Sequence, residues 1–234
     1  MLGAGPGFGA NFVRMDQTTE RLSRSIWIGV GLIIVILCFA FVLSRVQPRK
    51  PKPNAAALPV IGAVADFTLT NQAGSIMKLA DLRGRVWVAD IIFTRCAGPC
   101  PRMTRQMASL SQALPKTSEA RFVTLTTDPD FDSPEVLKEY GERFGANLNH
   151  WMFLTGGKKQ IAALAIDSLK LTAVEKKPEE RTDAADLFIH STIFVLVDKQ
   201  ARLRGIFETD GDGIEWPKME RKLLAAIQQL ELER

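Results

Sequence analysis

Hydrophobic and polar positions alternate along the chain in patterns that predict strands and helices in turn from about residue 60 onward. Short runs rich in β-branched and aromatic residues predict strands at 66–70, 76–79, 86–93, 121–126, 151–154, 192–197 and 202–207. Apolar residues at helical spacing, together with proline and serine start signals, predict helices at 101–114, 134–144, 158–169 and 216–232. This order predicts an α/β domain with a mixed sheet flanked by helices on both faces.

A different pattern occupies the N-terminal region, where residues 26–43 form an apolar run without charges. These 18 residues would form a helix of about 27 Å, which is just long enough to cross a bilayer core. A cleaved signal peptide is the alternative, but its polar leader would be long and no small-residue cleavage site closes the run. We therefore predict four segments: a disordered start at 1–24, a transmembrane anchor at 25–44, a basic, proline-rich tether at 45–59 and a globular domain at 60–234.

The formal net charge of +4 is concentrated ahead of the globular domain. Residues 1–53 hold seven Lys or Arg and two Asp or Glu, which leaves 23 basic and 24 acidic residues in the remainder. The basic tether predicts contact with membrane lipid, and the nearly neutral domain argues against nucleic acid as a partner. Basic residues flank the apolar run on both sides, with slightly more after it, so the positive-inside rule leans against an outside domain.

A pair of cysteines, Cys96 and Cys100, follows a predicted buried strand in the segment Cys-Ala-Gly-Pro-Cys-Pro. We predict that Cys100 caps a helix beginning at Pro101, where the helix dipole would lower the pKa of its thiol. Two thiolates and one imidazole form a soft site that suits Cu(I), or Cu(II) with an added weak ligand. The same thiols could instead exchange disulfides, or form a structural disulfide that stabilises little across so short a loop.

His190 is the candidate third ligand, because the strand that follows it is expected beside the cysteine strand. The chain has only two histidines, and His150, which precedes another predicted strand, is the substitute candidate. The third cysteine, Cys38, lies inside the apolar run and is interpreted as a small hydrophobic residue.

An acidic loop follows the predicted strand at 121–126 and contains Asp128, Asp130 and Asp132. Short acidic side chains commonly satisfy nearby backbone groups, so we interpret the loop as solvated and capping. A docking edge, or a support for metal ligands, is the alternative interpretation.

These features together resemble the Sco (SenC) family of membrane-anchored, thioredoxin-like copper proteins. The likeness covers roughly residues 60–232 and rests on four segments of this chain: 93–101 with both cysteines, 126–137, 151–156, and His190-Ser191-Thr192 before a strand. It implies a thioredoxin-like fold and copper ligation by Cys96, Cys100 and His190. It also implies a role in assembling the dinuclear copper centre of cytochrome c oxidase, with the copper-binding subunit of that oxidase and a copper donor protein as partners.

Two departures from the family pattern bear on function. The spacer 97–99 lacks the more usual acidic residue, and Arg95 adds a cation that should favour thiolates but weaken copper binding. The hypothesis is a copper chaperone rather than an enzyme, with a thiol–disulfide oxidoreductase that reduces the recipient's cysteines as the alternative. Because this chemistry suits an oxidising compartment, we expect a single-pass membrane protein whose C-terminal domain lies on the extracytoplasmic side.

Overall fold

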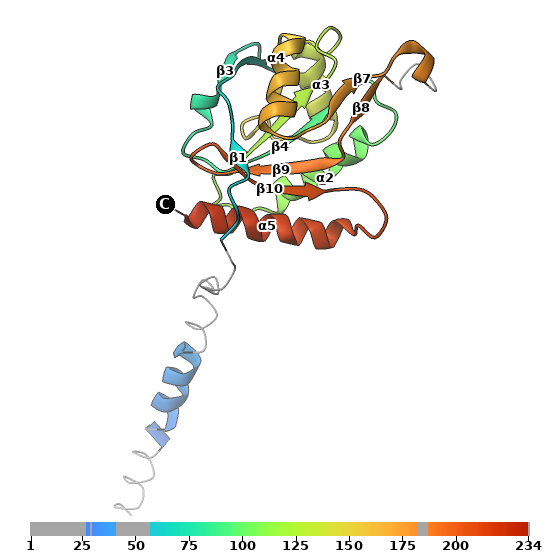
Figure 1. The fold of residues 1–234 in the computed structure, drawn as a ribbon. Coiled ribbons are helices and arrows are strands. Elements are labelled where there is room, and N and C mark those ends of the chain that lie inside the picture. The colour runs from blue at the N-terminus through green and yellow to red at the C-terminus, as the bar shows by residue number, and fades with distance from the viewer. Residues whose placement is uncertain (1–26, 29, 41–56, 182–186, 234) are drawn as a thin grey trace, which may run out of the picture. The chain divides into compact units, whose positions relative to one another are not determined.

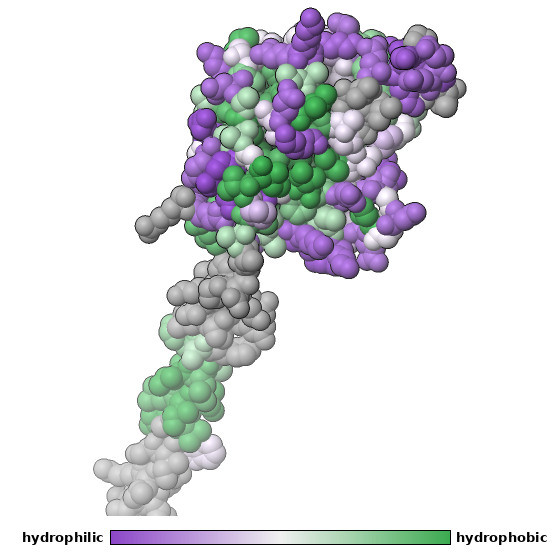
Figure 2. Space-filling view, in the orientation of Figure 1, coloured by the Kyte–Doolittle hydropathy of each residue, from purple (hydrophilic) through white to green (hydrophobic). Residues whose placement is uncertain are grey.

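The computed structural model describes residues 27–28, 30–40, 57–181 and 187–233. The chain divides into two compact units, residues 1–54 and 55–234. In the first unit, residues 27–28 and 30–40 are helical, and their side chains form the hydrophobic surface seen in Figure 2. None of the helices among the described residues is both long enough and apolar enough to span a membrane. The predicted disordered start and most of the predicted tether lie outside the described residues.

The second unit is built on a mixed sheet. Its described strands are β1 (Gly62–Ala63), β2 (Thr68–Asn71), β3 (Ile76–Lys78), β4 (Trp87–Ile92), β5 (Arg121–Thr126), β6 (Trp151–Thr155), β7 (Ala173–Glu175), β8 (Phe188–His190), β9 (Ile193–Val197) and β10 (Arg202–Glu208). Eight of them form one sheet in the order β1-β10-β9-β4-β5-β6-β2-β3. β4, β5 and β6 pair in parallel, and β9 pairs antiparallel with β4. The predicted neighbour of the cysteine strand is therefore confirmed.

Helices cover both faces of this sheet, as the sequence pattern predicts. The helices of the domain are α2 (Cys100–Ala113), α3 (Pro134–Arg143), α4 (Lys158–Ala163) and α5 (Trp216–Leu232), with the shorter turns η1 (Leu79–Asp81), η2 (Leu164–Ser168) and η3 (Pro178–Glu180). α2, α3 and α5 pack on one face of the sheet, whereas α4 and η2 pack on the other. Because side chains alternate along a strand, β4 supplies Val88 and Ile92 to the first core cluster and Ala89 and Ile91 to the second.

A two-stranded sheet of β7 and β8 projects from the main sheet (Figure 1) and is not predicted by the sequence pattern. Each strand has three residues, which is too short to show a clear alternation. The pair is antiparallel, with Ala173 opposite His190. His190 is therefore the last residue of a strand of its own, in addition to preceding β9.

Arg204 on β10 ties the start of the domain to its end. Its guanidinium donates to the carbonyl oxygen of Leu58 at 2.6 Å, to Asp198 at 2.8 Å and to Glu233 at 2.7 Å. Figure 1 accordingly shows the segment leading into β1 beside the C-terminal end of α5. Burial opposes ionisation of Asp198, but hydrogen bonds from Arg202 and Arg204 lower its pKa below the ordinary value.

Candidate metal centre

Both predicted cysteines lie at the C-terminal edge of β4, where the chain passes into α2. Cys96 donates its backbone N–H to the carbonyl oxygen of Phe93 at 3.2 Å, which turns the chain back towards the helix. Cys96 is 8% exposed and Cys100 is fully buried, and no disulfide joins them. The two thiols are hydrogen-bonded to one another, so the loop brings the sulfur atoms together on one side. The structural-disulfide alternative does not describe this state.

The predicted role of Cys100 as the helix cap is wrong. α2 begins one residue earlier than expected, with Pro99 in the helical region as its cap and with its carbonyl accepting from Arg102 and Met103 at 3.0 Å. Cys100 is thus the first residue within the helix, and its side chain turns into the core. Burial, followed by the hydrogen bond that the Cys100 thiol donates to Cys96, raises the pKa of the Cys100 thiol instead of lowering it. Desolvation of the thiolate outweighs any benefit from the helix dipole at this position.

The acidic loop between β5 and α3 holds Thr94 and Arg95, the two residues before Cys96, and Asp132 is the contact to Thr94. Asp132 is fully buried and accepts hydrogen bonds from the backbone N–H of Thr94 at 3.2 Å and from the hydroxyls of Thr94 and Thr126. Burial raises the pKa of Asp132 even though these hydrogen bonds favour its ionised form. Asp132 therefore joins the ends of β4 and β5 and fixes the base of the cysteine loop.

Arg95 is anchored to the same acidic loop. Its guanidinium pairs with Asp128 at 2.5 Å and lies 4.0 Å from the centroid of the Phe131 ring. The interpretation of the loop as solvated is therefore wrong for Asp128 and Asp132, which are both buried, and holds for Asp130, which is exposed. Asp128 compensates the charge of Arg95, so we no longer expect Arg95 to weaken copper binding as an uncompensated cation would.

In the sequence analysis, support of the metal ligands by the acidic loop is only the alternative interpretation. The position of Asp132 in the chain nevertheless indicates that it lies near the cysteines. Asp132 stands directly before Ser133, whose hydroxyl accepts from Val136 and caps α3, and this marks the end of a loop that follows a parallel strand. Loops at the C-terminal ends of neighbouring parallel strands meet at one edge of the sheet. Applied to the predicted strands, that rule puts the acidic loop beside the cysteine loop.

A chain of buried polar groups supports α2 below the thiols. The Thr104 hydroxyl donates to the carbonyl oxygen of Cys100 at 2.9 Å and lies 2.8 Å from the Tyr140 hydroxyl. On the same face of the sheet, Asp90 accepts from Thr124 at 2.7 Å, and Thr124 accepts from the Trp151 indole at 2.9 Å. The Thr104 bonds fix the first turn of α2, and the bonds of Thr124 pair polar groups on β4, β5 and β6 within an otherwise apolar cluster.

Strand β8 packs against the base of the cysteine loop. The ring of Phe188 meets that of Phe93 edge-on, with centroids 5.1 Å apart. Phe188 lies two residues before His190 and Phe93 three residues before Cys96, so the fold brings these two segments to one place. The side chain of His190 lies outside the described residues, and within the described part of the chain no three potential ligands gather as a metal cluster.

His150, the substitute candidate, lies at the opposite edge of the sheet. It precedes β6, and its carbonyl accepts from Phe122 at the start of β5, whereas the cysteines follow the end of β4. A strand of five or six residues separates these edges by roughly 17–20 Å. His150 instead contacts the guanidinium of Arg121. It is therefore not a ligand partner for the two thiols.

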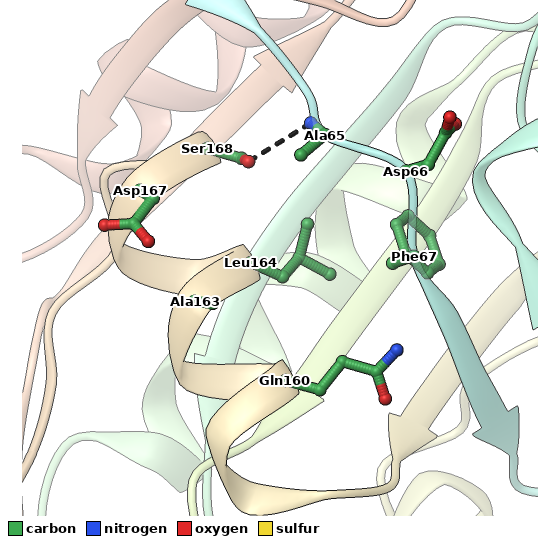
Figure 3. Close-up of a pocket in the computed structure, with 8 residues that line it drawn as sticks. All are labelled: Ala65, Asp66, Phe67, Gln160, Ala163, Leu164, Asp167 and Ser168. Carbon is green, nitrogen blue, oxygen red and sulfur yellow. Dashed lines mark hydrogen bonds between the residues drawn. The ribbon is translucent and has the colours of Figure 1, made fainter.

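A separate pocket opens on the other face of the sheet, between the segment before β2 and the helices α4 and η2 (Figure 3). Its lining includes Asp66, Gln160 and Asp167, and the Ser168 hydroxyl at its rim accepts from the backbone of Ala65 at 3.1 Å. Its volume of about 160 Å³ is below the roughly 300 Å³ at which ligand pockets begin. No predicted site residue lines it, so the thiol pair remains the candidate site.

Comparison with known proteins gives a consistent result. The SCO1/SenC family model matches residues 59–225. The SCO1 protein homolog of Bacillus subtilis (strain 168) is 35% identical over 162 residues, which cover 67% of this chain and 81% of that protein. The solved structure of BsSco, a member of the Sco family of cytochrome c oxidase assembly proteins, matches with a TM-score of 0.63 and 28% identity over 76% of this chain and all of that one.

A further solved structure supports the fold alone. Bradyrhizobium japonicum ScoI with copper bound matches with a TM-score of 0.59 and 22% identity, over 73% of this chain and 99% of that one. The mixed sheet, the flanking helices and the loop with two cysteines thus agree with a family match that spans nearly the whole folded domain, and this chain belongs to the SCO1/SenC family.

Proposed function

We propose that this chain is a membrane-anchored chaperone that binds copper through Cys96, Cys100 and His190 and delivers it to the dinuclear copper centre of cytochrome c oxidase. The observation that carries the proposal is the convergence of two buried cysteines, hydrogen-bonded to one another, in one short loop. Thiolates are soft ligands that select Cu(I), and an imidazole suits copper in either oxidation state. BsSco, which belongs to a family of cytochrome c oxidase assembly proteins, and the copper-bound Bradyrhizobium ScoI are consistent with this role for those relatives.

The surroundings of the thiols hold the cysteine loop in a fixed conformation. Asp132 fixes the base of the loop, and the contact between Phe188 and Phe93 holds strand β8 beside it. A preformed loop lowers the entropy cost of gathering ligands around the ion. In the proposed site, the copper ion replaces the thiol protons, and His190 at the end of β8 supplies the third ligand.

Replacing His190 by alanine tests the ligand set. If the imidazole completes the site, purified H190A should lose most of its copper, because a two-thiolate site would release the ion readily to competing chelators. The measurement is the copper-to-protein ratio of the full chain after dialysis against a Cu(I) chelator. His150→Ala is the matched control and should retain copper. Equal copper content in H190A and in the unaltered protein would remove His190 from the site.

Copper binding should depend on pH because burial raises the pKa of Cys100. Its thiol is protonated at neutral pH, so binding copper as a thiolate must release at least one proton. The apparent affinity should therefore rise at least about tenfold for each pH unit through the neutral range, tenfold for each proton released, and fall in the acidic direction. Competition with a chelator whose own pH dependence is known measures this. A flat profile between pH 6 and about 8 would show that the site binds copper without deprotonating Cys100.

Thiol–disulfide exchange is the second candidate function. The hydrogen bond between the two thiols places the sulfur atoms close enough for a disulfide to form when an oxidant accepts two electrons and two protons are released. The BsSco structure is associated with a disulfide switch in that protein. The H190A variant discriminates between the functions, because it should lose copper but reduce a disulfide substrate at the rate of the unaltered protein.

The membrane attachment in this proposal rests on the apolar run at residues 26–43 and on the hydrophobic helix described within it. An anchored domain meets a membrane-embedded recipient at a higher effective concentration than a free one. We place the domain on the extracytoplasmic side because the thiol chemistry suits an oxidising compartment. Protease protection of the C-terminal domain in sealed membrane vesicles of known orientation tests that side.

A further inference from the structure

Charged residues are distributed unequally between the two edges of the main sheet. One edge carries the loops before β4, β5 and β6, the turn between β9 and β10, and the end of α5. We call the segments 83–85, 115–121, 147–150, 198–204 and 231–233 the tether edge. These described segments hold seven basic residues, Arg83, Arg85, Lys116, Arg121, Lys199, Arg202 and Arg204, against four acidic ones, Glu119, Asp198, Glu231 and Glu233.

The opposite edge, here called the thiol edge, has the reverse balance. It consists of the segments 94–102, 127–135, 155–159 and 209–215, which follow the C-terminal ends of β4, β5, β6 and β10. They hold seven acidic residues, Asp128, Asp130, Asp132, Glu135, Asp210, Asp212 and Glu215, against four basic ones, Arg95, Arg102, Lys158 and Lys159. The domain is therefore electrically bipolar along its strands, across a length of roughly 20 Å.

Some of the positive charge at the tether edge is available to a partner. Arg83 is exposed and donates to the carbonyl oxygen of Gln200 at 3.3 Å, a neutral acceptor, and among the described residues no acidic side chain pairs with it. Lys116 is exposed in the loop before β5. Arg85 pairs with Glu119 at 3.4 Å, but that glutamate is 77% exposed at its side chain, so the pair is solvated and weak.

The chain also enters the domain at the tether edge. Arg204 holds the carbonyl oxygen of Leu58 there, and Leu58 is the second described residue of the domain. The sequence just before it contains Arg49, Lys50 and Lys52, so the basic character of the edge continues into the segment that leads from the apolar run. Positive charge on the domain is thus concentrated where the polypeptide connects to the proposed anchor.

We propose that the tether edge is a docking face for the headgroups of anionic phospholipids. This inference rests on the membrane attachment proposed above and adds an orientation of the folded domain. Each basic side chain near an anionic bilayer strengthens the docked state by about fivefold, whereas the acidic thiol edge is repelled. Docking on the tether edge turns Cys96 and Cys100 away from the lipid, towards a recipient that projects from the membrane. The domain's own charge distribution, in addition to the tether, then sets the height of the thiols above the bilayer.

The test measures acetylation of single lysines in the full chain, reconstituted in nanodiscs of phosphatidylcholine alone or of phosphatidylcholine mixed with phosphatidylglycerol. Lys116 reports on the tether edge, and Lys138, exposed on α3, is the internal reference. With phosphatidylglycerol, Lys116 should react at least about fivefold more slowly than on phosphatidylcholine. The protection should fade as salt is raised from about 0.1 M to 1 M, where the screening length falls from about 10 Å to 3 Å.

Two variants with the same change in charge provide the matched comparison. Arg83→Glu at the tether edge should remove most of the protection of Lys116, whereas Lys159→Glu at the thiol edge should leave it intact or increase it. Neither residue is part of the proposed copper site, so copper content should be unchanged in both. Equal loss of protection in the two variants would show a response to net charge alone and would overturn the proposed face.

Three further measurements test whether the tether edge binds anionic lipid. Equal reactivity of Lys116 on the two lipids overturns the inference, and so does protection that is the same on both and insensitive to salt. Protection by soluble polyglutamate over a phosphatidylcholine disc, but not by phosphatidylglycerol, would assign the face to an acidic protein instead. A chain that binds copper and resists extraction by alkaline carbonate, yet shows no lipid-dependent protection, defeats this inference alone. If alkaline carbonate extracts the protein from the membrane, both the proposed membrane anchor and this inference are wrong.

Discussion

Replacing Cys100 by serine is expected to remove copper from the protein and to end its thiol exchange at the same time. The residue is fully buried against Cys96, so no water or neighbouring thiol can take its place as a ligand. A hydroxyl is a hard and weakly acidic group, which Cu(I) does not prefer. Loss of a residue that only supports a ligand already costs about 10- to 100-fold in metal affinity, so loss of a ligand should cost at least 100-fold. Chelator competition with Cu(I) measures the change.

The matched control is Cys38→Ser, which makes the same substitution at an exposed cysteine in the N-terminal helix. It should retain copper and thiol exchange. Because a buried hydroxyl can also disturb the core, Cys100→Ala serves as a second variant without a new polar group, and a thermal melt checks that each protein is folded. A folded Cys100→Ala protein that holds copper as tightly as the unaltered chain would contradict the proposed thiolate pair.

The sheet is largely predictable from sequence because its central strands, β4, β5 and β6, are five or six residues long and almost entirely buried. β5 and α5 have the bounds that the hydrophobic pattern predicts, and α3 begins at Pro134 after the predicted cap at Ser133. In these elements the local signal and the tertiary packing favour the same structure. The β7–β8 pair is different, because three-residue strands carry too little pattern and form through contacts with distant segments such as that of Phe188 with Phe93.

The candidate site is also only partly predictable from the sequence. Spacing and residue type are enough to find Cys96, Cys100 and His190, since ligand chemistry depends on the side chains themselves. The state of the thiols is not predictable from spacing, because it depends on burial. The helix begins one residue earlier than predicted, and the fold buries the Cys100 side chain in the core, where desolvation reverses the expected change in its pKa.

The partners of Arg95 illustrate the same limit. From sequence, an arginine beside a ligand is a free cation that opposes copper. In the fold, Asp128 and Phe131 arrive from another loop and compensate it. The sequence shows that a charged residue lies next to the cysteine, but its electrostatic effect on the site depends on which distant residues the fold places beside it.

The largest expected effect on stability comes from replacing Arg204 by methionine. The Arg204 side chain is 4% exposed and binds Asp198, Glu233 and the carbonyl oxygen of Leu58. Its removal takes one donor from the buried Asp198, which keeps Arg202, and takes the guanidinium from Glu233 and from the Leu58 carbonyl, so the cost should be about 3 kcal/mol, the lower end for a broken buried pair. In a domain of this size the melting temperature should fall by about 6–12 °C. Denaturant titration of the full chain in detergent measures the free energy of unfolding directly.

Arg202 provides the matched control, because it binds the same Asp198 but its side chain is 40% exposed. Arg202→Met should cost less than about 1 kcal/mol, as solvent screens an exposed ion pair.

Measuring stability at low pH distinguishes the contribution of the Arg204–Asp198 ion pair from that of packing by the arginine side chain. The folded-state pKa of Asp198 lies below its ordinary value of 3.8, so this stabilisation is present above that pH and is lost as the pH falls through the folded value. The difference in stability between the unaltered protein and R204M should therefore narrow in strong acid, and a difference that stays constant would assign the effect to packing of the arginine side chain instead.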